Sequence, residues 1–227
     1  MLLGLLGLSV TVATIVVISI AFTPSTPATT DWRSNWAVET GFDVTIDSEG
    51  FQLPSSIAFI PNPGTSPKDP LYFVTELRGK VKVVTNDRTV LTFAEDFFTT
   101  RPKRSNPTII QSVGLAGICL APEQGYLFVT FSYHDSNDIL RNNIVRFQSR
   151  PGTFSIAPTS QVDFTEVFSS HLSAPSHQIG PCQVKDDLLY VSVGDGHQIE
   201  QSQQMDSFFG KILRMTLDGL PVSSNPF

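Results

Sequence analysis

The sequence predicts an all-β fold of the β-propeller type, and three observations point to it. A unit of three strand-like segments recurs three times between residues 56 and 215. These segments are rich in β-branched and aromatic residues, and Gly, Pro, Asn and Asp separate them, as turns require. Charged residues form only 16% of the chain, against 41% hydrophobic residues, which is usual for strand-rich proteins. Short antiparallel strands repeated at this spacing describe propeller blades.

Residues 1–22 are almost wholly apolar and contain no charged side chain, so they predict a helix. A helix of this length spans about 33 Å, enough to cross a bilayer core. Two alternatives stay open: a secretory signal peptide cleaved after a small-x-small site at 19–21, or an uncleaved membrane anchor. Both predict an extracytoplasmic protein, periplasmic or secreted, which contacts the membrane only if this helix is retained. Residues 23–35 then read as a Pro-rich linker.

Residues 36–227 are expected to form a partial propeller domain of about three to four blades. The three segments of each unit lie at 56–61, 71–75 and 80–84, at 116–122, 126–130 and 143–147, and at 180–184, 189–193 and 211–215. The second segment of each unit is nearly continuously apolar, which predicts burial by neighbouring blades on both faces. More polar fourth strands are expected at 90–93 and 162–167, and a leading strand at 42–46.

Two points of architecture follow from this repeat. A β-sandwich is the rival fold, but it would not require the same order of segments to recur three times. Propellers usually need four to eight blades to close a ring, so the sequence is expected to be an amino-terminal fragment.

Charge and cysteine content narrow the function classes. The net charge of −6 argues against a nucleic-acid partner, because such binding relies on Lys and Arg contacts to phosphate. Cys119 and Cys182 both lie in apolar, strand-like segments, and we favour buried free thiols. A disulfide is permitted if the domain is exported. The chain has no Cys-x-x-Cys pattern that would suggest zinc.

The third unit contains more specific sequences, in the order SHQIG (176–180), LYVSVGDG (189–196), GKILRMTLDG (210–219) and NPF (225–227). This order resembles the PQQ-dependent soluble glucose dehydrogenase and aldose sugar dehydrogenase family, also called glucose/sorbosone dehydrogenases. The sequences LPSSIAF (53–59), VTE (74–76), GKV (79–81) and GLAGI (114–118) agree with it. The similarity runs from about residue 42 to residue 227.

The resemblance implies a six-bladed propeller that holds a quinone and a sugar at the mouth of its central channel. It implies that His177 is the general base, which takes a proton from the anomeric hydroxyl while hydride passes from C1 to PQQ. Imidazole suits that task because its usual pKa, about 6.5, lies near neutral pH. An external electron acceptor is implied as a partner, and calcium is permitted as a second cofactor.

The residues that hold the quinone carboxylates, and any calcium ligands, are expected beyond Phe227, so the chain alone is expected to be inactive. Within the chain no metal site is predicted, because the roughly six oxygen ligands of calcium cannot be assembled. Asp195 also reads as a turn former, and Glu76 as one partner of a turn salt bridge with Arg78. The candidates for lining the substrate channel are Glu76, Gln111, Gln178, Asp195 and His197.

Two departures from the family pattern keep a second function open. Pro181 stands where the family commonly has Arg or another polar residue, and Ser112 stands where Gln or Glu is usual, with Gln111 one residue further away. Both departures favour a non-catalytic propeller that binds a glycan or a protein. A propeller hydrolase is a third alternative, but it needs a metal held by several carboxylate and Asn ligands, and no such set is found. The leading hypothesis is an exported sugar oxidoreductase.

Overall fold

The computed structural model describes residues 38–98, 113–152, 154–163 and 176–225. The described residues divide between two units, one that ends at Thr45 and one that begins at Ile46. The expected helix at 1–22 and linker at 23–35 lie outside the described residues. No helix within the described ranges is long and apolar enough to span a membrane. The prediction of a leading strand at 42–46 is wrong, because these residues pair with no other strand.

Residues 46–227 form three antiparallel sheets in which the strands follow chain order. Sheet 1 contains β1 (Pro54–Phe59), β2 (Pro70–Glu76), β3 (Lys80–Thr85) and β4 (Val90–Ala94). Sheet 2 contains β5 (Gly114–Ala121), β6 (Tyr126–His134), β7 (Leu140–Gln148) and β8 (Ser160–Asp163). Sheet 3 contains β9 (Ile179–Lys185), β10 (Leu188–Val193) and β11 (Lys211–Thr216), with the 3-10 helix η2 (Ile199–Gln203) before β11. The three predicted units therefore correspond to the three sheets.

Sheet 2 is buried on both faces, which explains why its central strand is apolar throughout. Leu127, Val129 and Phe131 pack in a core shared with sheet 1, whereas Phe128 packs in a core shared with sheet 3. In β10, by contrast, buried residues alternate with partly exposed ones. The prediction that neighbouring sheets cover both faces of the apolar strand is confirmed for β6.

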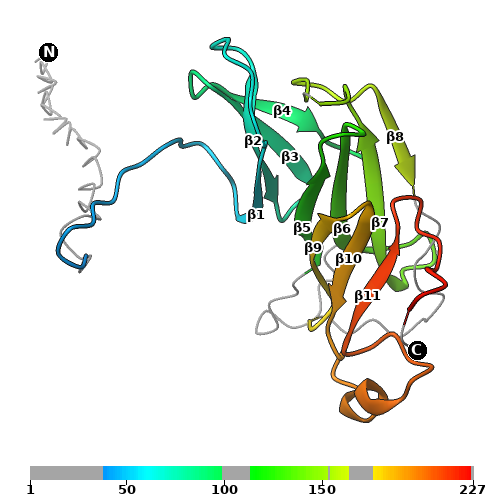
Figure 1. The fold of residues 1–227 in the computed structure, drawn as a ribbon. Coiled ribbons are helices and arrows are strands. Elements are labelled where there is room, and N and C mark those ends of the chain that lie inside the picture. Colours follow the sequence, from blue (N-terminus) through cyan, green and yellow to red (C-terminus); the bar gives the residue numbers. More distant parts are fainter. Residues whose placement is uncertain (1–37, 99–112, 153, 164–175, 226–227) are drawn as a thin grey trace, which may run out of the picture. The chain divides into compact units, whose positions relative to one another are not determined.

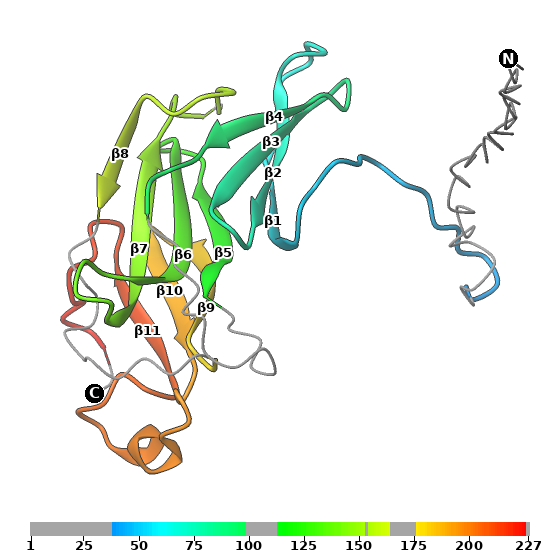
Figure 2. The ribbon, with the colours of Figure 1, turned by 180° about the vertical axis from the view of Figure 1, so that it is seen from behind.

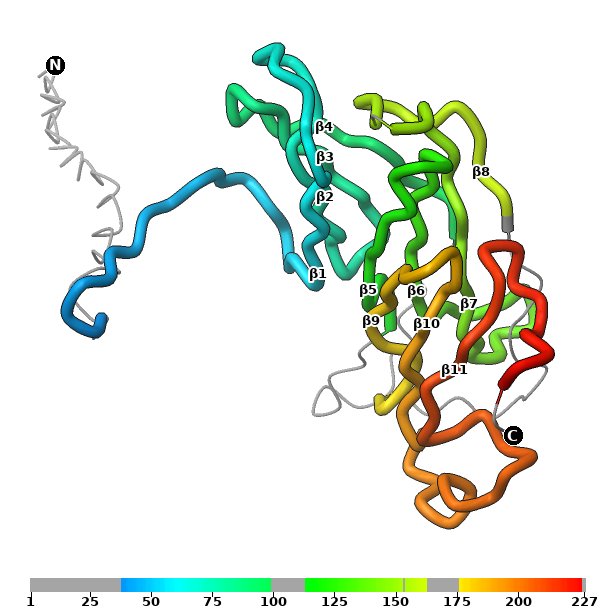
Figure 3. Tube along the Cα trace, in the orientation of Figure 1, coloured from blue at the N-terminus to red at the C-terminus, as the bar shows by residue number. Residues whose placement is uncertain are grey.

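The three sheets pack on one another in chain order through their first strands. Strand β5 lies between β1 and β9, and Figures 1 and 2 show the same order from opposite sides. The tube in Figure 3, coloured from blue to red along the sequence, shows the same succession of sheets 1, 2 and 3. The rival β-sandwich would place the strands in two layers. A series of sheets that converge on their first strands is the packing of consecutive propeller blades.

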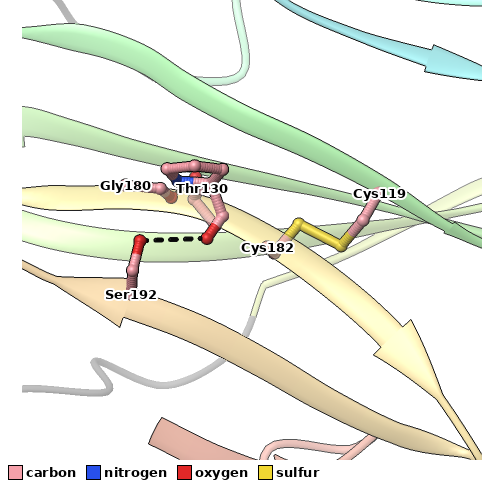
Figure 4. The surroundings of a disulfide bond; sticks show 6 residues. Cys119, Thr130, Gly180, Cys182 and Ser192 are labelled. Atoms are coloured by element: carbon pink, nitrogen blue, oxygen red, sulfur yellow. Dashed lines mark hydrogen bonds between the residues drawn. A yellow bond between two sulfur atoms is a disulfide. The ribbon is translucent and has the colours of Figure 1, made fainter. Parts of the chain in front are cut away.

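Cys119 in β5 and Cys182 in β9 form a disulfide that joins sheets 2 and 3, with a Cα–Cα distance of 5.6 Å (Figure 4). The preference for free thiols is therefore wrong. Each cysteine does occupy an apolar strand, as expected. The pattern within one strand carries no information on which strand of the next sheet lies beside it, and that neighbour brings the two thiols within bonding reach.

Candidate functional site

The predicted site residues that the structure describes gather at one end of the sheets, the end where β1, β5 and β9 begin. The antiparallel register places the ends of β2 and β10 at this same end, through the pairs Pro54–Glu76 and Ile179–Val193. The backbone N–H of Leu115 donates to the carbonyl of Leu77 at 3.1 Å, which aligns sheets 1 and 2. We call this the first-strand end. Gln111 lies outside the described residues.

His177 and Asp195 form a hydrogen-bonded pair at the first-strand end. His177 precedes β9 and Asp195 follows β10, and His177 Nδ1 lies 2.9 Å from Asp195 Oδ1. An ionised carboxylate can only accept, so Nδ1 carries the proton and Nε2 of a neutral ring is left as the acceptor. The His177 side chain is 57% exposed, so a ligand can reach it.

His197 completes the cluster. Its ring stacks on that of His177 with 4.2 Å between centroids. Its Nε2 lies 2.6 Å from Ser176 Oγ, and its backbone N–H donates to Asp195 Oδ1 at 3.1 Å. Asp195 therefore acts in the turn, as predicted, and orients the His177 ring as well.

The backbone at this cluster has an uncommon conformation. His177 and His197 have φ angles of 57° and 61°, in the left-handed region, which costs a residue other than Gly roughly 1–2 kcal/mol. Two hydrogen bonds hold the His177 segment in place, from Gly196 N to His177 O (2.9 Å) and from Gly194 N to Gln178 O (2.8 Å). A Cβ on Gly194 would lie 2.3 Å from His177 O, so the approach of these two loops requires glycine there.

The cluster also sets the charge of Asp195. The hydrogen bond from His177 is the largest cause that lowers the pKa of Asp195, and the N–H of His197 lowers it further. Asp195 therefore remains ionised at neutral pH. An exposed imidazole with a fixed carboxylate behind it can accept a proton at Nε2 and be stabilised as the imidazolium.

The other candidates have different surroundings. Glu76 is buried, at 3% exposure, and its Oε1 accepts the backbone N–H of Gln52 at 2.8 Å. Its expected salt bridge with Arg78 does not form, because the Arg78 guanidinium points to Val113 O at 3.5 Å. Gln178 is partly buried beside His177. The hydrogen bond between Gln52 and Glu76 is a structural contact.

His134, unlike His177 and His197, is buried. It is the last residue of β6, is 7% exposed, and its Nδ1 lies 3.1 Å from Asp138 Oδ1. Arg141 of β7 donates its Nε–H to Oδ2 of Asp135, the residue after His134, at 2.6 Å, and this bond lowers the pKa of Asp135. The apolar run that continues to Phe131 and Tyr133 was the signal that β6 extends this far.

A quinone with several carboxylates needs a set of cations, and the first-strand end does not offer one among the described residues. Lys211 Nζ donates to the backbone oxygens of Ser202 (2.7 Å) and Phe209 (3.0 Å). Lys80 Nζ pairs with Glu95 at 3.1 Å, and Arg78 and Arg141 bind the groups named above. No cluster of three or more His, Cys, Asp or Glu side chains that could hold a metal ion occurs in the described ranges. The described residues therefore fit a proton-accepting site and do not fit a quinone cradle.

Comparison with protein families identifies the family of the chain. Residues 51–227 match the family described as Glucose / Sorbosone dehydrogenase. The chain belongs to this family. The match includes all three sheets and the His177–Asp195 pair, and it confirms the family resemblance expected from the sequence.

Solved glucose/sorbosone dehydrogenase-like structures share the fold. A protein from Thermus thermophilus, described as a putative oxidoreductase (glucose dehydrogenase), is 25% identical, with a TM-score of 0.55 over 78% of this chain and 47% of that one. The PQQ-bound aldose sugar dehydrogenase of Streptomyces coelicolor is 21% identical, with a TM-score of 0.57 over 79% and 49%. The apo-form aldose sugar dehydrogenase of Escherichia coli is 17% identical, with a TM-score of 0.51 over 78% and 48%. The chain spans about half the length of these proteins. No curated protein sequence matches it significantly.

Proposed function

We propose that this chain is part of an exported, quinone-dependent aldose dehydrogenase in which His177 is the general base. The observation that carries the proposal is the exposed His177 ring held by Asp195 at 2.9 Å, at the end of the sheets where their first strands converge. Membership of the glucose/sorbosone dehydrogenase family supports the reaction class. In this proposal the three sheets are consecutive blades of a six-bladed propeller, and the pair faces its central channel.

The chemical step assigned to this chain is a proton transfer. His177 Nε2 accepts the proton of the sugar's anomeric hydroxyl, and the resulting imidazolium is stabilised by ionised Asp195 at Nδ1. A positioned base of this kind typically contributes about 10²–10⁴-fold to the rate. The stacked ring of His197 limits rotation of the base.

The oxidation also needs an acceptor for the electron pair, and we propose PQQ because a structural relative of this chain is PQQ-bound. Of the described cations at the first-strand end, Lys211, Arg78 and Arg141 donate to groups of the chain itself, and Lys80 pairs with Glu95. We therefore assign no described residue to the quinone or to calcium. A sugar substrate and an external electron acceptor are the partners that follow from this proposal.

Steady-state oxidation of aldoses by the intact protein tests the proposal. The protein is loaded with PQQ and calcium and assayed with an artificial dye as acceptor. His177→Ala should lower kcat by about 10²-fold or more. Lys185→Ala, an exposed change on the strand that follows His177, is the matched control and should leave kcat unchanged.

Two results would overturn the proposal. Wild-type activity retained by His177→Ala would remove His177 from the mechanism. A correctly loaded wild-type protein that oxidises no aldose would favour the non-catalytic glycan- or protein-binding alternative, which Pro181 already suggests.

Export is the second part of the proposal, and the Cys119–Cys182 disulfide supports it. Structural disulfides persist in oxidising compartments and are rare in the cytosol. A carboxy-terminal fusion to a reporter that is active only outside the cytoplasm should be active. Release of that fusion from the membrane distinguishes a cleaved signal peptide from an anchor, and a reporter confined to the cytoplasm would contradict export.

A further inference from the structure

Strand β9, which directly follows the His177 loop, is an edge strand. The order of sheet 3 is β11-β10-β9, so β9 pairs within its sheet on one side only. Pro181 in β9 has no N–H to donate, as is usual for edge strands. The place of His177 relative to sheet 2 therefore depends on what attaches β9 to that sheet.

Two strong attachments run from sheet 2 to neighbouring positions of β9. The Thr130 hydroxyl of β6 donates to the carbonyl oxygen of Gly180 at 2.6 Å, and the disulfide joins Cys119 of β5 to Cys182. Figure 4 shows Thr130 beside Gly180, with the disulfide further along the same strand. We call Thr130, Cys119 and Cys182 the β9 clamp. Its first contact on β9 is with Gly180, three residues after His177 in the chain.

The packing around the clamp brings the two backbones together. A Cβ on Gly117 of β5 would lie 2.6 Å from Pro181 Cα and 3.1 Å from Gly180 O. Thr130 is fully buried, so its hydroxyl has no water to replace a lost bond to Gly180. The β9 clamp and the close contact between Gly117 and Pro181 together allow little movement of β9 against sheet 2.

The equivalent threonine of sheet 1 makes no such attachment. Thr75 stands on β2 where Thr130 stands on β6, and it too is fully buried. Its hydroxyl lies 3.0 Å from Ser55 Oγ and 3.4 Å from Ser56 O, both within sheet 1. A buried threonine at this position therefore does not by itself require a bond to the next sheet.

We propose that the β9 clamp positions His177: it fixes the strand that carries the base against sheet 2, and so sets where Nε2 meets the substrate. This inference rests on the proposed role of His177 as the base. The clamp residues are positioning groups and do not touch the reacting atoms. A displacement of about 1 Å in a reacting group can lower the rate by up to about 10²-fold.

The main experiment compares three variants of the intact, PQQ-loaded protein. Thr130→Val keeps the shape of the side chain and removes the hydroxyl, and it should lower kcat about tenfold or more while the KM for sugar stays within about twofold. Thr130→Ser keeps the hydroxyl and should restore kcat. Thr75→Val makes the same change in a buried strand of sheet 1 and should leave kcat unchanged.

A second readout does not depend on turnover. Imidazole nitrogen NMR of the intact protein reports the hydrogen bond between His177 Nδ1 and Asp195. Thr130→Val should change the His177 signals, whereas Thr75→Val should leave them as in the wild type. If the wild type oxidises no aldose, the proposed function fails and the NMR comparison alone decides whether the clamp positions His177.

The disulfide gives an independent arm if Thr130→Val does not fold. A dithiol reductant converts the bond to two thiols and is itself oxidised to a disulfide, and the Cys119→Ser/Cys182→Ser double variant removes the link permanently. Both should reproduce the loss of kcat and the change in His177 signals. The proposal is overturned if Thr130→Val matches Thr75→Val in both readouts, or if the His177 signals change while kcat does not.

Discussion

His177 and Asp195 lie 18 positions apart in the chain and meet because β9 begins where β10 ends. The sequence motifs already singled out both residues and His197. What they did not contain was the contact itself, because it depends on the antiparallel register and on left-handed backbone at His177. The sequence likewise did not show the hydrogen bond between Glu76 and Gln52, because Gln52 lies in a different segment, before β1.

The pKa of Asp195 provides a test of this contact that needs no activity. His177 is the largest cause of the lowered value, so His177→Ala should raise it towards the usual value of about 3.9. Because the pKa of Asp195 is lower in the folded protein than in the unfolded chain, ionised Asp195 stabilises the fold at pH values above the unfolded pKa. This contribution to the free energy of unfolding is lost as the pH falls through the folded pKa. Titration by carboxyl carbon NMR measures the change.

The matched control is Asp135, whose pKa is lowered by Arg141 and not by a histidine. It should titrate alike in the wild type and in His177→Ala. An Asp195 titration that does not move in the variant would contradict the hydrogen-bonded pair.

Gly117 supports a second prediction for a single residue. Gly117→Ala places a Cβ against the Pro181 backbone, which cannot rotate away, and should cost about 1–3 kcal/mol in free energy of unfolding. At Gly180 the nearest atom to an added Cβ is the Ser192 hydroxyl, which can change rotamer. Gly180→Ala should therefore cost less in urea denaturation, and the reverse order would contradict the close approach of β5 and β9.

At the scale of elements, hydrophobic pattern and turn residues predicted the strands well. The segments expected at 71–75, 126–130 and 189–193 all lie within β2, β6 and β10. The failures have physical reasons. Residues 42–46 alternate like a strand but find no partner for a ladder, and β6 continues to His134 because β7 extends beside it. Pairing between strands, which one strand's pattern does not contain, decides both cases.

The disulfide was missed for the same reason, and it makes a prediction for β5 and β9. The cysteines are 63 residues apart, and closing a loop of that size restricts the unfolded chain. The Cys119→Ser/Cys182→Ser variant should lose about 2–4 kcal/mol in free energy of unfolding. The chain has two cysteines, so the native protein should take up no alkylating agent before reduction. Labelling of the unreduced, folded protein would contradict the bond.

At the scale of the three sheets together, sheet 2 packs against sheet 1 on one face and against sheet 3 on the other. Leu127 and Phe128 are adjacent, point to opposite faces, and are both fully buried. Leu127→Ala and Phe128→Ala should therefore each cost about 2–5 kcal/mol, which urea denaturation can measure. Phe59→Ala, at a site that is 65% exposed on β1, is the control and should cost below about 1 kcal/mol. A small loss of free energy of unfolding in either core variant would mean that no neighbouring sheet covers one face of sheet 2.

Because the Cys119–Cys182 bond crosses from one sheet to the next, it has a consequence for biogenesis. Cys119 leaves the ribosome well before Cys182 and cannot find its partner until sheet 3 has docked on sheet 2. The number of free thiols in newly made chains therefore reports how far assembly has progressed. If those thiols are alkylated at successive times after synthesis, the time at which they disappear gives the time at which the second and third sheets join.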